Sequence, residues 1–230
     1  MKDHTLHTFG ESALVVEFGD TVDPLIQTRV AELTARLDAS GAPGLLEVVP
    51  TFRSVLIEFD PDVTDGDTIL ANLPAAEARA SSGRTWQVPV RVDAEVAEDA
   101  AEAAAALNID VATLHERLLG SPLTVGMYGF VPGNCYMTGV DPSLTLPRRT
   151  RPRPPVPPGS LIMAVGQAVI LPVSMPTGWY VVGRTTARMF DAQAEPPVPF
   201  AVGDRVRLRA VDPDEFETLR LRDDRGVQEL

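Results

Sequence analysis

Cysteine and histidine, which supply many nucleophiles, bases and metal ligands, are nearly missing from this sequence: 230 residues contain one cysteine and three histidines. A single cysteine cannot form an internal disulfide, so we expect a reducing, cytoplasmic compartment. No run of about 18 apolar residues occurs, and the start lacks the basic and apolar regions of a signal peptide. We therefore expect no membrane span, no secretory leader and no metal site.

Basic residues are also few, and the net charge of −12 disfavours nucleic acid and acidic lipid surfaces as partners. The charge is unevenly distributed along the chain. Residues 1–140 carry 21 acidic and 8 basic side chains, whereas residues 141–210 carry 4 and 9. The positive excess is therefore confined to the middle of the chain, where it could attract a small anionic substrate.

The first part of the chain alternates between strand and helix patterns. β-forming runs occupy 12–18, 45–50, 54–59 and 85–92, and helical spacing occupies 23–39 and 65–73. Asp23 is a suitable N-cap before Pro24 at the first helical position. The resulting order, βαββαβ, predicts a ferredoxin-like α+β domain over residues 1–93.

The remainder changes character twice. An alanine-rich stretch and a second capped segment predict two short helices, which form a helical connection over 94–120. Short β-like runs separated by Gly/Pro turns then predict a β-barrel domain over 121–230. Within it, the proline-rich segment 147–159 should be extended.

Several segments, in this order and spacing, resemble the family of the 5-oxoprolinase B subunit, which includes the protein called allophanate hydrolase subunit 1 and the sporulation-kinase inhibitor. The segments are SALVVEFGD, VPTFRSVLIEFDP, GFVPGNCYM, PRRTRPRPPVPPGS, GQAVILP, PTGWYVVGRT, MFD and PFAVGDRVRL, with His115. The resemblance covers nearly the whole chain. It implies an N-terminal α+β domain followed by a cyclophilin-like β-barrel, and the urea-carboxylase carboxyltransferase domain resembles such a chain joined to the homologous C subunit.

The resemblance also implies a function. The chain would be one component of a heteromeric ATP-dependent amide or lactam hydrolase that converts 5-oxo-L-proline to L-glutamate. Its site would be shared with the C subunit, a third subunit would complete the reaction, and ATP would be used by the complex with no cofactor assigned to this chain. Two alternatives remain: a non-catalytic protein-binding module like the kinase inhibitor, or a carboxyltransferase-like half of a urea or allophanate pathway enzyme.

Cys135 lies in the glycine-rich stretch GMYGFVPGNCYMTG, residues 126–139. A nucleophilic cysteine needs a nearby base, and His115 is the sole plausible one, so we interpret Cys135 as a small buried hydrophobe. The stretch itself is either a simple hairpin turn or a wall of a substrate cleft. The resemblance favours the cleft, which would be formed by Gly129, Phe130, Pro132, Gly133 and Tyr136.

Arginines supply the candidate anion ligands. Arg148, Arg149 and Arg153 match basic positions of the family, and a guanidinium group binds carboxylate or phosphate through two parallel hydrogen bonds. A solvated linker is the alternative. Gln167 and Arg184 match family positions too, although Arg184 could instead pair with Asp191 or Asp204. Trp179 is expected in the barrel core.

Some positions differ from the family pattern. Val131 and Ala168 stand where threonine is usual, Leu171 replaces a tyrosine, and Asn134 replaces an aromatic residue. A glycine-rich acidic loop is also missing after residue 92. We therefore expect a divergent member with no assigned catalytic residue, and with either an altered substrate or no catalysis.

Overall fold

The computed structural model describes residues 4–75 and 83–230, and the chain divides into two compact units, Met1–Ser81 and Ser82–Leu230. Each unit has its own hydrophobic core. No helix in the described ranges is both long enough and apolar enough to cross a bilayer.

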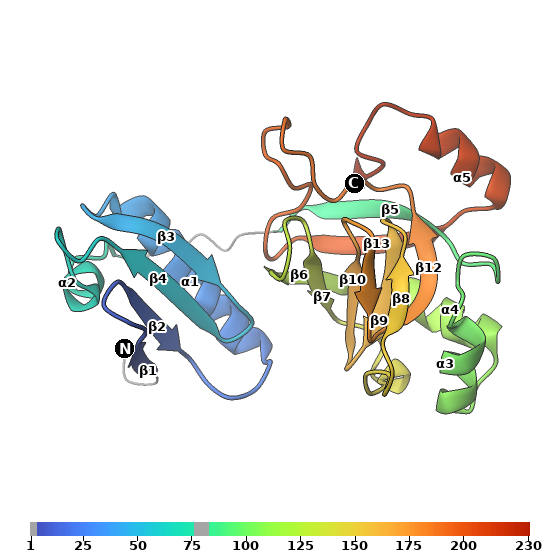
Figure 1. Ribbon diagram of the computed structural model, residues 1–230, viewed down its shortest axis with the longest axis horizontal. Helices are drawn as coiled ribbons and strands as arrows, with labels where there is room; N and C mark the ends of the chain where they lie inside the picture. Colours follow the sequence, from blue (N-terminus) through green and yellow to red (C-terminus); the bar gives the residue numbers. More distant parts are fainter. Residues whose placement is uncertain (1–3, 76–82) are drawn as a thin grey trace. The chain divides into compact units, whose positions relative to one another are not determined.

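The first unit is a four-stranded antiparallel sheet with strand order β1-β2-β4-β3. Its helices are α1 and α2, and α1 lies across one face of the sheet (Figure 1). The bounds are β1 Thr5–Thr8, β2 Ala13–Glu17, α1 Pro24–Ser40, β3 Leu45–Pro50, β4 Ser54–Phe59 and α2 Gly66–Ala71.

Helix α1 lies within one residue of its predicted range at each end, and Asp23 is its N-cap as predicted. The Asp23 side chain accepts a hydrogen bond from the Leu25 amide at 2.7 Å, and Gly41 ends the helix in the left-handed conformation. Val30, Leu33 and Leu37 lie at helical spacing and are buried. They pack with the buried, alternating residues of β4, so helical and strand periodicity converge on one core.

The predicted βαββαβ order is wrong in its last element. Strand β5, Thr85–Arg91, belongs to the second unit, where it lies parallel to β13, and its Val88 and Val90 are fully buried in that unit's core. The sheet position beside β2 is taken by β1 instead. Strand β1 escapes prediction because its four residues are all exposed, which removes the alternation that marks a strand.

The second unit is a closed barrel of seven strands in the order β12-β9-β10-β7-β6-β13-β5, closed by pairing between β12 and β5 (Figure 1). The mixed α+β class and the expected barrel are therefore confirmed. Strand β14, Gln228–Glu229, adds to the edge of β5. The other bounds are β6 Leu123–Tyr128, β7 Cys135–Thr138, β9 Ser160–Ala164, β10 Gln167–Ile170, β12 Tyr180–Thr185 and β13 Arg205–Ala210.

Helices α3, Ala100–Leu107, and α4, Val111–Leu119, belong to the barrel unit. Ala103, Leu114 and Leu118 are fully buried in the barrel core, so residues 94–120 are part of this domain and not a connection between two domains. Residues 95–99, expected in the first helix, form turns before it. A short 3-10 helix, Pro142–Leu144, and helix α5, Pro213–Arg220, complete the unit.

A second layer covers part of the barrel's outer surface. Strands β8, Arg153–Val156, and β11, Met175–Thr177, form a separate antiparallel pair. Alternation along β10 sends Ala168 and Ile170 into the barrel core and Val169 outward. The outward side chains pack with Val156 and Trp179 in a small hydrophobic cluster, so the expectation that Trp179 lies in the barrel core is wrong.

Candidate functional site

The loop between β6 and β7 is a tight turn closed by Asn134. The Asn134 amide donates to the Val131 carbonyl at 3.0 Å, and its side-chain Nδ2 donates to the Gly129 carbonyl at 3.0 Å. Gly133 has φ +78° and lies against the backbone of Met189, where a methyl group would be 2.6 Å from the carbonyl oxygen. Hydrogen bonds and close packing therefore fix the shape of the loop.

Phe130 is the exposed tip of this loop. Its side chain is 82% exposed, and its φ of +80° is strained for a residue other than glycine. Pro132 is exposed beside it, whereas Gly133 is buried. The fold thus holds an aromatic ring in solvent at a conformational cost, an arrangement common at binding sites.

A pocket of about 310 Å³ lies between this loop and the β8–β11 layer. Among the described residues, Arg148 is the one charged side chain in its wall, and the other wall residues are mainly apolar or aromatic. Of the residues predicted for the site, Phe130, Tyr136 and Arg148 line it. The remaining wall residues are Asn134, Ile162, Val169, Leu171, Met175, Pro176, Thr177, Gly178 and Trp179.

Arg148 lies over the ring of Trp179, with its guanidinium carbon 5.9 Å from the ring centroid. Tyr136 meets the same ring edge-on, with centroids 6.0 Å apart. No carboxylate among residues 4–75 and 83–230 lies within ion-pairing distance of Arg148. The pocket therefore presents one guanidinium group, without an ionic partner from the described chain, beside aromatic surface.

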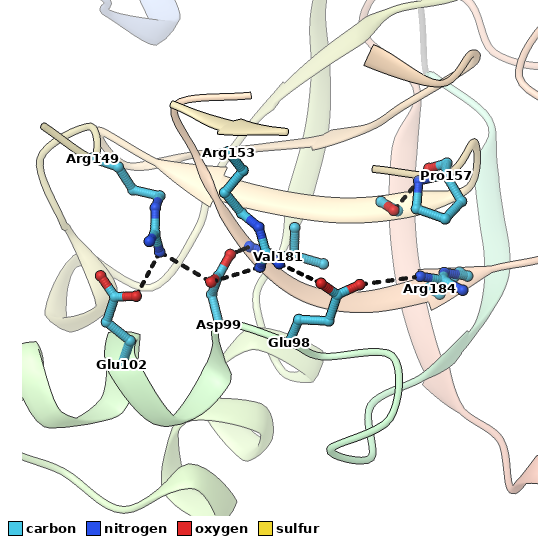
Figure 2. Close-up of polar contacts among 9 residues, drawn as sticks. Glu98, Asp99, Glu102, Arg149, Arg153, Pro157, Val181 and Arg184 are labelled. Carbon is cyan, nitrogen blue, oxygen red and sulfur yellow. Dashed lines mark hydrogen bonds and ion pairs between the residues drawn. The ribbon is translucent and has the colours of Figure 1, made fainter. Parts of the chain in front are cut away.

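The other predicted arginines point elsewhere. Figure 2 shows an alternating row of charges in the order Glu102, Arg149, Asp99, Arg153, Glu98 and Arg184. The acids come from α3 and the turns before it. Arg149 contacts Asp99 at 3.0 Å and Glu102 at 2.7 Å, Arg153 contacts Asp99 at 2.7 Å and also Glu98, and Arg184 reaches Glu98 at 3.5 Å.

This row, which we call the α3 ion-pair row, gives Arg149, Arg153 and Arg184 acidic partners within the chain. The hydrogen bond between Arg153 and Asp99 is the main cause of the raised pKa of the Arg153 guanidinium group. The row matches neither sequence interpretation, because these arginines are neither a solvated linker nor open ligands of the pocket. Arg184 pairs with Glu98, not with Asp191 or Asp204.

Asp99 lies at the centre of the α3 ion-pair row, and no local pattern in the sequence marks it as a partner of the arginines. It is 4% exposed and accepts hydrogen bonds from Arg149, from Arg153 and from the Val181 amide. The signal in the sequence that could have indicated this pairing is the charge complementarity between the acids at 93–102 and the arginines at 148–153. Gln167, at the start of β10, does not line the pocket.

Cys135 behaves as the sequence predicts. Its side chain is fully buried, and burial raises the pKa of the thiol to about 12. His115 is also buried, and the loss of solvent lowers the pKa of its imidazole. Burial and the raised pKa therefore both disfavour the nucleophilic thiolate form of Cys135.

The positions that differ from the family pattern separate into two groups. Asn134 and Leu171 line the pocket, so these differences change its wall. Ala168 is fully buried in the barrel core, and Val131 does not line the pocket.

The described residues contain no group of three or more His, Cys, Asp or Glu side chains that could hold a metal ion.

Comparison with known proteins identifies relatives over most of the chain. The family described as carboxyltransferase domain, subdomain C and D, matches residues 4–200. A Bacillus subtilis protein, named as the B subunit of 5-oxoprolinase, is 24% identical over 234 residues, which cover 94% of this chain and 97% of the relative. The protein of the same name from Haemophilus influenzae is 32% identical over 165 residues, which cover 68% and 72%.

Two solved structures also resemble this chain. TTHA0988 is 31% identical with a TM-score of 0.77; the match covers 87% of this chain but 40% of that longer chain. The urea carboxylase of Kluyveromyces lactis superposes with a TM-score of 0.76 over 99% of this chain, which spans 24% of the enzyme. At 19% identity, the second likeness concerns the fold alone.

Proposed function

Because the chain belongs to the family described as carboxyltransferase domain, subdomain C and D, we propose that it is the B-type component of a heteromeric, ATP-dependent hydrolase. The proposed reaction opens a small amide or lactam, and 5-oxo-L-proline to L-glutamate is the first to test. Water adds a hydroxyl group to the lactam carbonyl carbon and a proton to its nitrogen, while ATP is hydrolysed to ADP and phosphate by the complex.

The observation that carries the proposal is the guanidinium of Arg148, which has no ionic partner within the described ranges and lies in an aromatic and aliphatic pocket. A small carboxylic acid with an apolar body matches that wall, because the guanidinium fork binds the carboxylate and the aromatic rings cover the body. Because Arg149 and Arg153 are paired with acids, Arg148 is the one positive charge in the described pocket wall, which suits a monocarboxylate better than a polyphosphate.

A partner completes the proposed site. The relatives are named as subunits, and this chain spans a minor part of TTHA0988 and of the urea carboxylase. The described pocket wall contains no histidine, aspartate, glutamate, lysine or cysteine that could act as a general base. We therefore assign ATP and the catalytic groups to a homologous C-type partner and a third subunit, while this chain holds the substrate carboxylate.

The test is an ATPase and glutamate-formation assay with the co-expressed C-type partner and third subunit. We expect 5-oxo-L-proline to stimulate ATP hydrolysis and Arg148→Ala to raise KM at least tenfold, equivalent to about 1.4 kcal/mol. Arg148→Lys should be nearly as impaired, because lysine keeps the charge but loses the fork.

Arg151→Ala is the matched control, since Arg151 is exposed in the same segment and does not line the pocket. It should leave KM unchanged. Equal KM values for wild type, Arg148→Ala and Arg151→Ala would remove Arg148 from the substrate site. A complex that hydrolyses no ATP in response to lactams or linear amides would refute the enzyme assignment.

Phe130 favours a second candidate, the non-catalytic protein-binding module. A strained phenylalanine that is 82% exposed suits insertion into another protein. Binding to a histidine kinase without any ligand, at an affinity lowered by Phe130→Gly, would support this function. Lactam-dependent ATP hydrolysis would support the enzyme.

A further inference from the structure

We infer that Asp99 is a positioning residue, which sets Arg148 over Trp179 without itself lining the pocket. The inference rests on the proposed function only for the identity of the ligand. The geometry concerns two neighbouring segments that both supply wall residues of the pocket: the proline-rich segment with Arg148 and the turn into β12 with Trp179.

Asp99 forms two hydrogen bonds with Val181 of strand β12. The Val181 amide donates to Asp99 Oδ2 at 2.8 Å, and the Asp99 amide donates to the Val181 carbonyl at 2.9 Å. Val181 is fully buried and follows Trp179 by two residues in the chain. The turn that presents Trp179 is therefore attached to the start of α3.

The same carboxylate holds the arginine segment. Asp99 Oδ1 contacts Arg149 at 3.0 Å and Arg153 at 2.7 Å, one residue and five residues beyond Arg148. The Arg149 amide also donates to the carbonyl of Gly178 in the pocket wall at 2.8 Å. Asp99 thus joins both segments, with one oxygen directed to each, as the contacts in Figure 2 show.

Charge and burial make this link rigid. Asp99 is almost fully buried, so charge-assisted bonds to it are screened little by solvent, whereas Glu98 and Glu102 are more exposed members of the row. Loss of the Asp99 charge would leave Arg149 and Arg153 partly uncompensated, and the arginine segment would move relative to Trp179.

Asp204 supplies a matched control for a merely structural role. It is 2% exposed and accepts three N–H groups, from Arg84, Trp86 and Ala201, but it contacts neither pocket segment. These two aspartates are therefore linked to different tryptophans, Asp204 directly to Trp86 and Asp99 through Val181 to Trp179. The chain has no third tryptophan.

The experiment is ¹⁹F NMR of the full chain labelled with 5-fluorotryptophan, with resonances assigned from Trp86→Phe. We expect Asp99→Asn to shift the Trp179 resonance and leave that of Trp86 in place, and Asp204→Asn to do the reverse. Arg149→Lys, which keeps the bonds between Asp99 and Val181, provides a second variant if Asp99→Asn does not fold. A folded Asp99→Asn or Arg149→Lys protein with an unmoved Trp179 resonance overturns the inference.

Calorimetric titration of the assembled complex with 5-oxo-L-proline supplies the functional arm. Asp99→Asn should weaken binding about tenfold in the wild-type background and add no further loss in the Arg148→Ala background, because it acts through Arg148. An equal loss in both backgrounds overturns that route of action. If the wild-type complex binds no lactam, the proposed function fails, and the ¹⁹F result still decides whether Asp99 positions Trp179.

Discussion

Gly133→Ala tests whether close packing against residues 189–190 fixes the β6–β7 loop. Gly133 has φ +78°, and an added methyl group would lie 2.6 Å from the Met189 carbonyl oxygen and 2.7 Å from Phe190 Cβ. Gly166 in the β9–β10 turn is the matched control, because its φ is +73° but its nearest contact is an ordinary 3.8 Å to Thr145 Oγ1. Both variants incur backbone strain, but only Gly133→Ala also incurs the clash.

The expected magnitudes follow from these two contributions. Left-handed backbone costs a residue with a Cβ about 1–2 kcal/mol, which applies at both sites. Overpacking adds about 1–3 kcal/mol at Gly133, where the atoms that must shift belong to the backbone and to a Cβ. For a domain of this size, about 2–4 °C per kcal/mol makes Gly133→Ala melt roughly 2–12 °C below Gly166→Ala.

Tryptophan fluorescence is the appropriate assay, because Trp86 and Trp179 both lie in the barrel unit and report its unfolding alone. Thermal and urea unfolding should agree on the order wild type, Gly166→Ala, Gly133→Ala. If the two variants have the same midpoint within about one degree, packing on Met189 and Phe190 does not hold the loop, and the argument that Phe130 is presented by a rigid turn fails.

Three shorter predictions concern other residues of the barrel. Cys135 should resist a disulfide reagent at pH 8 until the barrel unfolds, because its thiol is buried with a raised pKa; rapid labelling of native protein would contradict this. Burial lowers the pKa of His115, so the unfolded chain binds the extra proton as pH falls below about 6.5. The unfolding free energy should therefore fall from pH 7.5 to 5.5, less steeply in His115→Gln, and equal slopes in urea titrations would exclude His115 as the cause. Phe130→Gly should change barrel stability by less than about 1 kcal/mol, since it relieves φ strain at an exposed site, yet weaken partner capture by about 2 kcal/mol in calorimetry. Undiminished affinity would place Phe130 outside the interface.

Local signals in the sequence predict individual elements better than they predict which sheet an element joins. Asp23, Pro24 and the apolar spacing that follows place α1 within one residue at each end, because capping and periodicity act over a few residues. Strand β5 is also placed nearly to the residue. Its partner β13 lies more than a hundred residues further along the chain, and no local pattern identifies that pairing.

The sequence likewise identifies some residues of the candidate site and not others. The loop residues and Arg148 stand out in the sequence because glycine, proline and arginine are unusual where they occur. Ile162, Leu171 and Trp179 do not, because strand alternation alone cannot say whether an outward face meets solvent, a covering layer or a pocket. Asp99 was hidden for another reason: an acidic residue at the start of an alanine-rich helix already has a sufficient local explanation as a cap.

Arg148, Arg149 and Arg153 differ in what surrounds each of them, not in their chemistry. A run of free arginines would create a broad positive field that attracts any anion, including phosphate esters. The α3 ion-pair row neutralises Arg149 and Arg153 and uses them to hold the segment, while Arg148 remains beside Trp179 without an ionic partner among the described residues. Under the proposed function, acids about fifty residues upstream thus hold Arg149 and Arg153 away from the ligand and leave Arg148 as the oriented carboxylate anchor of the pocket. Selectivity for a small monocarboxylate then depends on these acids as much as on Arg148.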